Sequence, residues 1–158
     1  MNVEKTVFAQ LLSFIPRYQF DKCVTRYRGN YRVKTFTCWE QFIVMCFAQW
    51  TYRDSLRDIE TCLHAMPTKL YHIGLRSKIA RSTIADANES RDWHIFADFC
   101  HYLIRAEKLY HDDDNFKLEL KNAVYAGIAR RLICVSHYFH GPSSGKTKEL
   151  SSFIPSLI

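Results

Sequence analysis

Apolar side chains recur every three or four residues through most of the first 110 positions, which is the spacing of amphipathic helices. The first such pattern covers residues 3–14 and stops before Pro16. The second covers residues 17–28. The positions predicted to face inward are Val7, Leu11 and Phe14 in the first helix and Phe20, Val24 and Tyr27 in the second.

Capping signals predict where the next two helices begin. Thr37-Cys38-Trp39-Glu40 has the spacing of a capping box and precedes an apolar run, so a largely buried helix should start there and continue to about Trp50. Asp54 or Ser55 can cap a helix over 56–66, which Pro67 would close.

The pattern changes after that point. A short segment over 69–73 ends at Gly74, Ser82 or Thr83 caps a short helix through Asn88, and a long helix runs from Asp92 to Tyr110. An acidic loop follows, and residues 116–126 then alternate apolar and polar side chains as a β-strand does. The predicted fold is therefore mainly α, with one β-strand that has no partner in the sequence.

Composition favours a folded, intracellular domain. The chain has 158 residues, of which 47% are hydrophobic, enough for one domain with a real core. Its six cysteines show no C-x-x-C spacing and are predicted to be buried, reduced thiols. With neither a signal peptide nor an apolar run long enough to span a bilayer, the chain is expected to be soluble and cytoplasmic, with no membrane partner.

Charge is distributed unevenly. Residues 1–91 contain 14 Lys and Arg against 8 Asp and Glu, whereas residues 92–126 contain 4 against 7. A basic N-terminal part suits a face that binds a polyanion, although many solvated surfaces have the same composition.

The pattern most typical of DNA binding is a helix, a basic loop and a second helix that begins with Ser and Thr. A helix N-terminus can donate backbone N–H groups to a phosphate while its side chains reach base edges. The alternative is that Ser82 only caps its helix and that the cations are solvated. The residues predicted to face DNA are Arg76, Lys78, Arg81, Ser82, Thr83, Asn88 and Arg91.

A second basic cluster lies over residues 26–36, where Arg and Lys alternate with Tyr and Phe. Cations there can neutralise phosphates and aromatic rings can stack on bases. The rings are more simply interpreted as core anchors of a helix–loop junction. The cluster consists of Arg26, Arg28, Arg32 and Lys34 with Tyr27, Tyr31 and Phe36.

Other motifs do not support a catalytic or metal site. Residues 141–147 resemble a phosphate-binding loop, but only three residues separate the glycines and no amphipathic helix follows. The adjacent carboxylates of 112–114 cannot all face one ion, and the histidines lack ligand spacing. We predict no catalytic residue, no metal ligand and no cofactor in this chain.

Several segments resemble the N-terminal region of bacterial insertion-sequence transposases of the branch named for insertion sequence four. The resemblance covers essentially all of residues 1–126. It is carried by Phe36-Thr37-Cys38-Trp39-Glu40-Gln41-Phe42, Thr51-Tyr52-Arg53-Asp54-Ser55-Leu56-Arg57-Asp58-Ile59-Glu60, Ala80-Arg81-Ser82-Thr83-Ile84-Ala85-Asp86-Ala87-Asn88-Glu89 and Asn122-Ala123-Val124-Tyr125-Ala126.

The resemblance implies that the strand ending near Tyr125 opens a ribonuclease-H-like catalytic domain. In such transposases two Asp and one Glu hold two divalent metals, usually Mg²⁺, for strand cleavage and transfer. The first Asp should follow that strand, where this chain has Gly127-Ile128. Codons permitted for residues 128 onward, read one base upstream, can encode Asp-Cys-Ala-Thr-Ile-Asp-Leu, which is the motif expected there.

The resulting interpretation is a transposase fragment altered by a frameshift. The helical N-terminal domain would span 1–115, the first catalytic strand 116–126 and the out-of-frame tail 127–158. The fragment is predicted to be inactive and to retain at most binding to transposon-end DNA, with self-association or association with an intact transposase left open. The alternative is a structural module that packs on a catalytic domain or a second subunit without touching DNA.

Overall fold

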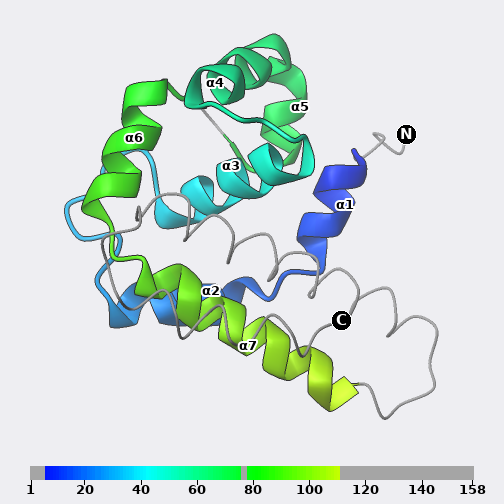
Figure 1. The fold of residues 1–158 in the computed structure, drawn as a ribbon, viewed down its shortest axis with the longest axis vertical. Helices are drawn as coiled ribbons and strands as arrows, with labels where there is room; N and C mark the ends of the chain where they lie inside the picture. Colours follow the sequence, from blue (N-terminus) through cyan, green and yellow to red (C-terminus); the bar gives the residue numbers. More distant parts are fainter. Residues whose placement is uncertain (1–5, 76–77, 111–158) are drawn as a thin grey trace. The chain divides into compact units, whose positions relative to one another are not determined.

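The computed structural model describes residues 6–75 and 78–110. This part of the chain contains seven helices and no strand (Figure 1). The chain divides into two compact units after Ile95, a point within the last helix. The helices are α1 (Val7–Ser13), α2 (Arg17–Arg26), α3 (Cys38–Trp50), α4 (Leu56–Ala65), α5 (Pro67–His72), α6 (Arg81–Ser90) and α7 (His94–Tyr110).

The core of the first unit is built around α3, and the sequence predicted this helix correctly. Thr37 Oγ1 accepts a hydrogen bond of 3.2 Å from the Glu40 N–H, and Glu40 Oε2 accepts one of 2.8 Å from the Thr37 N–H. These two bonds form the expected capping box. Every side chain from residue 41 to residue 48 is buried, so α3 is surrounded by its neighbours.

Aromatic contacts join the first two helices to α3. Phe8 of α1 meets Phe47 edge-on, with ring centroids 5.9 Å apart. Phe20 of α2 is fully buried and lies 5.1 Å from the ring of Phe42. In Figure 1, α4, α5 and α6 lie around the other sides of α3. The first unit is therefore a helical cluster with α3 at its centre.

The predicted buried face of the first helix is wrong. Helix α1 begins at Val7, with the Thr6 side chain as its cap, and its buried residues are Ala9 and Leu12. Val7 is 73% exposed and Phe14 is 40% exposed. The helix has only seven residues, and the contact of its second residue, Phe8, with α3 sets which side faces inward. Of the three residues predicted to face inward, only Leu11 is half-buried.

The predictions for α2 and α4 are confirmed apart from their last residues. Helix α2 buries Phe20 and Val24 as expected and ends at Arg26, two residues early, which leaves Tyr27 half-buried at its C-cap. Ser55 Oγ accepts a hydrogen bond of 3.1 Å from the Asp58 N–H and caps α4. Pro67 ends α4 and also opens α5 as its first residue.

The long helix α7 begins at His94, and the Asp92 carboxylate accepts a hydrogen bond of 2.9 Å from the His94 N–H. In the second unit, Phe99, Leu103 and Ala106 are buried at helical spacing. The predicted strand 116–126, the tail 127–158 and the boundary after residue 115 lie outside the described residues.

Two further expectations concern cysteines and membranes. Among the described residues, five cysteines are not joined in disulfides, and all but the half-buried Cys62 are buried. None of the helices in the described ranges has the length and apolar character needed to cross a membrane.

Candidate nucleic-acid interface

The C-terminus of α2 leads into the basic segment through a Schellman motif. The Gly29 N–H donates to the Val24 carbonyl at 2.9 Å, and the Arg28 N–H donates to the Thr25 carbonyl at 3.2 Å. Arg28 adopts φ 52°, the left-handed conformation that this motif requires and that glycine usually supplies. An arginine is therefore held in an unfavourable backbone conformation at the start of the basic segment.

Gly29 has a different role, which is close packing. A Cβ atom at this position would overlap the Ile95 Cδ1 atom and lie 2.8 Å from the Cys38 sulfur. The next residue, Asn30, accepts a hydrogen bond of 2.9 Å on Oδ1 from the Cys38 N–H. These contacts fix the segment against the N-terminus of α3.

The remainder of this segment presents cations and one exposed ring. Residues 27–36 are called the basic loop below. Arg32 also has a positive φ, of 59°, and its guanidinium lies 5.1 Å from the Tyr31 ring centroid. Tyr31 is 66% exposed, while Phe36 is buried. The interpretation of the aromatic residues as core anchors is thus right for Phe36 and wrong for Tyr31.

The second basic segment leads into α6. The helix begins at Arg81 with Ala80 at the N-cap, and neither Ser82 nor Thr83 caps it, contrary to the prediction. Instead, Glu60 Oε1 from α4 accepts a hydrogen bond of 3.2 Å from the Arg81 N–H. A carboxylate from a neighbouring helix thus satisfies one of the free amides and opposes the positive end of the helix dipole.

The residues predicted to face DNA fall into three groups in the structure. Lys78, Arg81 and Ser82 are exposed at or just before the N-terminus of α6. Thr83 is half-buried, and Asn88 and Arg91 are turned into a network within the first unit. Arg76 lies outside the described residues.

Gln41 of α3 organises that network. It is 2% exposed, and its Nε2 donates a hydrogen bond of 2.6 Å to Asn88 Oδ1. Its Oε1 accepts one of 2.7 Å from Arg91 Nη1. Arg91 Nη2 also donates to the Phe36 carbonyl, and the guanidinium lies 5.4 Å from the Phe36 ring centroid. The network joins α3, the end of α6 and the end of the basic loop.

Burial changes the protonation behaviour of two groups here. Burial lowers the pKa of the Arg91 guanidinium, and the nearby Cys38 and Glu40 side chains partly offset this effect. Burial raises the pKa of the Cys38 thiol, while the Arg91 charge acts in the opposite direction. Cys38 is therefore a neutral packing residue in the folded protein.

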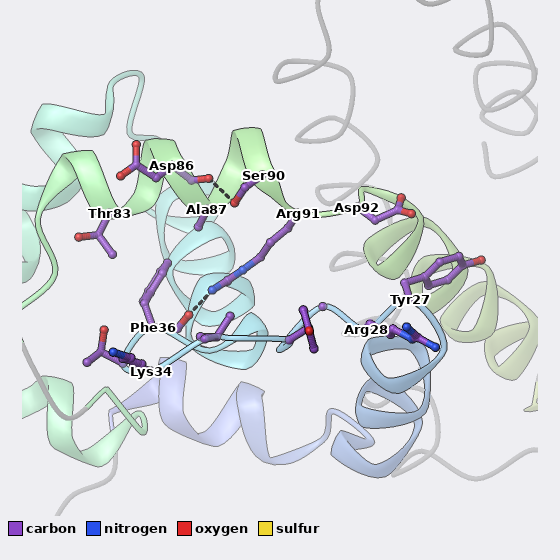
Figure 2. A pocket seen from close by; sticks show the side chains of 14 residues that line it. Tyr27, Arg28, Lys34, Phe36, Thr83, Asp86, Ala87, Ser90, Arg91 and Asp92 are labelled. Carbon is purple, nitrogen blue, oxygen red and sulfur yellow. Dashed lines mark hydrogen bonds between the residues drawn. The ribbon is translucent and has the colours of Figure 1, made fainter.

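A pocket of about 510 Å³ lies between the basic loop and α6. Figure 2 shows the loop along one wall and α6 along the other, with Arg91 reaching between them. Its cations are Arg28, Lys34 and Arg91, and its carboxylates are Asp86 and Asp92. Its remaining lining residues are Tyr27, Gly29, Tyr31, Val33, Thr35, Phe36, Thr83, Ala87 and Ser90.

The pocket brings together the two basic segments that the sequence analysis treated as separate. Lys34 of the loop and Thr83 of α6 line the same cavity, although 49 positions separate them in the sequence. Sequence reasoning also missed Gln41, whose only signal was a polar residue within an apolar helical run. Within the described residues, no group of three His, Cys, Asp or Glu could hold a metal ion.

Comparison with known proteins gives one match. Residues 3–76 match the family model described as a domain of unknown function, DUF4372. A search of curated proteins found no match, and neither did a search of solved structures. The matched segment contains the basic loop and α3 but ends before α6, so only one wall of the pocket lies within it.

Proposed function

We propose that this chain is the DNA-binding N-terminal part of an insertion-sequence transposase, that it acts in the cytoplasm, and that it has lost catalysis. The observation that carries the proposal is the shared pocket, which places cations of the basic loop opposite the face of α6 that runs from Thr83 to Ser90. Lys78, Arg81 and Ser82 are exposed at or just before the N-terminus of the same helix. Such a combination suits contact with a phosphate backbone, with α6 as the element nearest the bases.

The residues predicted to face DNA have two different roles in this proposal, positioning α6 and contacting phosphates. Asn88 and Arg91 position α6 through Gln41, because their hydrogen-bonding groups are directed into the network. The direct phosphate contacts are assigned to Arg76, Lys78 and Arg81 together with Arg28 and Lys34. Ser82 and Thr83 lie in the first turn of α6, where hydroxyls can also reach phosphate oxygens.

The loss of catalysis rests on the sequence after residue 126. The in-frame chain has Gly127-Ile128 where the resemblance requires the first metal-binding Asp. Two-metal strand transfer needs several carboxylates to hold its ions. We infer that a one-base frameshift replaced the first of them. Sequencing the coding DNA from codon 120 onward tests this inference, since a second open frame must encode Asp-Cys-Ala-Thr-Ile-Asp-Leu at that point.

DNA binding is tested by fluorescence anisotropy with a labelled duplex at several salt concentrations. With three to five phosphate contacts, log K should fall against log salt with a slope of about −3 to −4.5, since each contact contributes about −0.9. The double variant Lys78→Glu/Arg81→Glu should weaken binding at least tenfold at low salt. The matched control Lys22→Glu/Lys69→Glu makes the same charge change on α2 and α5, outside both pocket walls, and should change the affinity far less.

A second candidate function is an interaction module that packs on another protein chain and does not touch DNA. Its supporting observation is the exposure of large apolar side chains, with Val7 73%, Tyr18 69% and Tyr52 74% exposed. Such side chains are typical of the centres of protein interfaces. If this candidate is right, the charge reversals leave DNA affinity unchanged, and size-exclusion chromatography shows self-association or binding to an intact transposase.

A further inference from the structure

The pocket between the basic loop and α6 has a composition that phosphate-backbone contact alone does not require. Its volume of about 510 Å³ lies within the range of about 300–1,000 Å³ that is typical of small-ligand sites. Aromatic rings line it together with cations and hydroxyls. A flat phosphate-binding surface would need only the cations, so the hollow shape and the rings call for a separate explanation.

Arg91 provides a rigid, flat surface in this pocket. Its Nη1 and Nη2 atoms donate to Gln41 Oε1 and to the Phe36 carbonyl, and these two hydrogen bonds hold the guanidinium in place within the protein. The central carbon of the guanidinium lies over the Phe36 ring, 5.4 Å from its centroid. Planar guanidinium groups and aromatic rings are the surfaces on which proteins stack unpaired bases.

The two loop cations lie at opposite ends of this stacking surface. Figure 2 shows Lys34 near Phe36 at one end of the loop wall and Arg28 beside Tyr27 at the other. A nucleotide within a strand carries a phosphate on each side of its sugar, so two separated cations suit it better than they suit a single phosphate. On the α6 wall, Thr83 adds a hydroxyl that can accept a hydrogen bond from a base.

We propose that this pocket takes one unpaired nucleotide of a DNA strand, with its base stacked in the pocket and its flanking phosphates on Arg28 and Lys34. The inference rests on the proposed DNA-binding function and adds the substrate class to it. A paired base cannot enter, because its faces are covered by its neighbours in the stack. The site therefore prefers DNA with a bulged, flipped or terminal unpaired base.

The test compares a duplex that carries one bulged 2-aminopurine with the fully paired duplex of the same sequence, using the full-length chain. We expect about tenfold tighter binding of the bulged duplex, the size of one stacked base, together with quenching of the 2-aminopurine. Tyr31→Ala and Lys34→Ala should each reduce this preference at least threefold. Tyr52→Ala, which removes an equally exposed ring outside the pocket, should leave it unchanged.

The outcomes separate this inference from the proposed function. Equal binding of the two duplexes overturns the nucleotide pocket and leaves DNA binding intact, whereas binding of neither overturns both. If free deoxyadenosine monophosphate raises the Tm and the bulged duplex shows no preference, the site takes a free nucleotide and the inference is wrong. Circular dichroism of each variant confirms that a lost preference does not reflect unfolding.

Discussion

Arg91 and Gln41 are joined by a hydrogen bond of 2.7 Å from the Arg91 Nη1 atom to the Gln41 Oε1 atom, across 50 positions of sequence. The same Gln41 side chain donates to Asn88 on the last full turn of α6. One buried amide thus fixes both the end of α6 and the guanidinium at the pocket. The position of α6 relative to the basic loop therefore depends on α3.

The first prediction concerns this amide. Gln41→Met keeps the side-chain length and removes both hydrogen bonds, so Asn88 and the Arg91 charge lose a partner. We expect the free energy of unfolding to fall by about 2–3 kcal/mol, because a lost bond to a buried charged group costs about 1.5–3 kcal/mol. Urea unfolding followed by circular dichroism measures it. Glu89→Gln, at an exposed position of α6, is the control, and a loss of under about 0.5 kcal/mol for Gln41→Met would refute the role of the network.

The second prediction concerns Glu60, which accepts a hydrogen bond from the first amide of α6. Glu60→Gln keeps an acceptor oxygen and removes the negative charge beside this helix end. If DNA phosphates approach the N-terminus of α6, the affinity for duplex DNA should rise about threefold to tenfold at low salt. Glu89→Gln makes the same charge change near the other end of α6 and should have a smaller effect. An unchanged affinity for Glu60→Gln would show that this helix end does not meet phosphate.

The third prediction concerns the two left-handed residues at helix ends. Arg28 at φ 52° and Tyr52 at φ 53° close α2 and α3, and a left-handed conformation costs about 1–2 kcal/mol for such residues. Arg28→Gly and Tyr52→Gly should each raise the Tm in differential scanning calorimetry. Arg28→Gly should also weaken DNA binding, because Arg28 lines the pocket, whereas Tyr52→Gly should leave the DNA affinity unchanged. Gly74, at φ 90°, supplies the opposite test, because Gly74→Ala should lower the Tm.

The fourth prediction concerns pH. Burial raises the pKa of the Cys38 thiol in the folded state, so as pH rises the unfolded chain releases this proton first. The contribution of the protonated Cys38 thiol to the stability of the folded state is complete below the ordinary thiol pKa of about 8.5. It is lost as pH rises toward the raised folded-state pKa. Wild type should therefore lose more stability than Cys38→Ala between pH 7.5 and pH 9.5 in urea unfolding. Parallel pH profiles for the two proteins would contradict this.

The fifth prediction concerns thiol reactivity. Among the cysteines of the described region, Cys62 is half-buried and the others are buried. Iodoacetamide should therefore modify Cys62 before the other four cysteines of the described region in the native protein, while Cys38 should react only after unfolding. Peptide mapping by mass spectrometry reads the order of modification. Early labelling of Cys38 would show that the basic loop opens readily from α3.

Local signals were sufficient for much of the helical pattern. The capping box at Thr37 and the cap at Ser55 predicted where α3 and α4 begin, because these bonds are made between residues three positions apart. The face of α1 was missed because it depends on Phe8 meeting Phe47, a contact that no local pattern encodes.

The candidate site was predictable only in its parts. Asn88 and Arg91 have a spacing that fits a DNA-reading helix, yet Gln41, far away in the sequence, accepts or donates their hydrogen bonds. The pocket likewise joins residue 34 to residue 83, and each segment alone resembles a solvated basic stretch. Tertiary packing decides which cations become part of a cavity.

Gly29 has a consequence for the order in which the pocket can assemble. Its missing side chain admits both the Cys38 sulfur and the Ile95 side chain, so the basic loop reaches its final position only when a residue 66 positions further along has docked. Closing so long a stretch of chain carries an entropic cost that short-range contacts do not share. The basic loop should therefore be among the last parts of the first unit to reach its final conformation during folding. During synthesis, the pocket can form only after residue 95 has emerged from the ribosome.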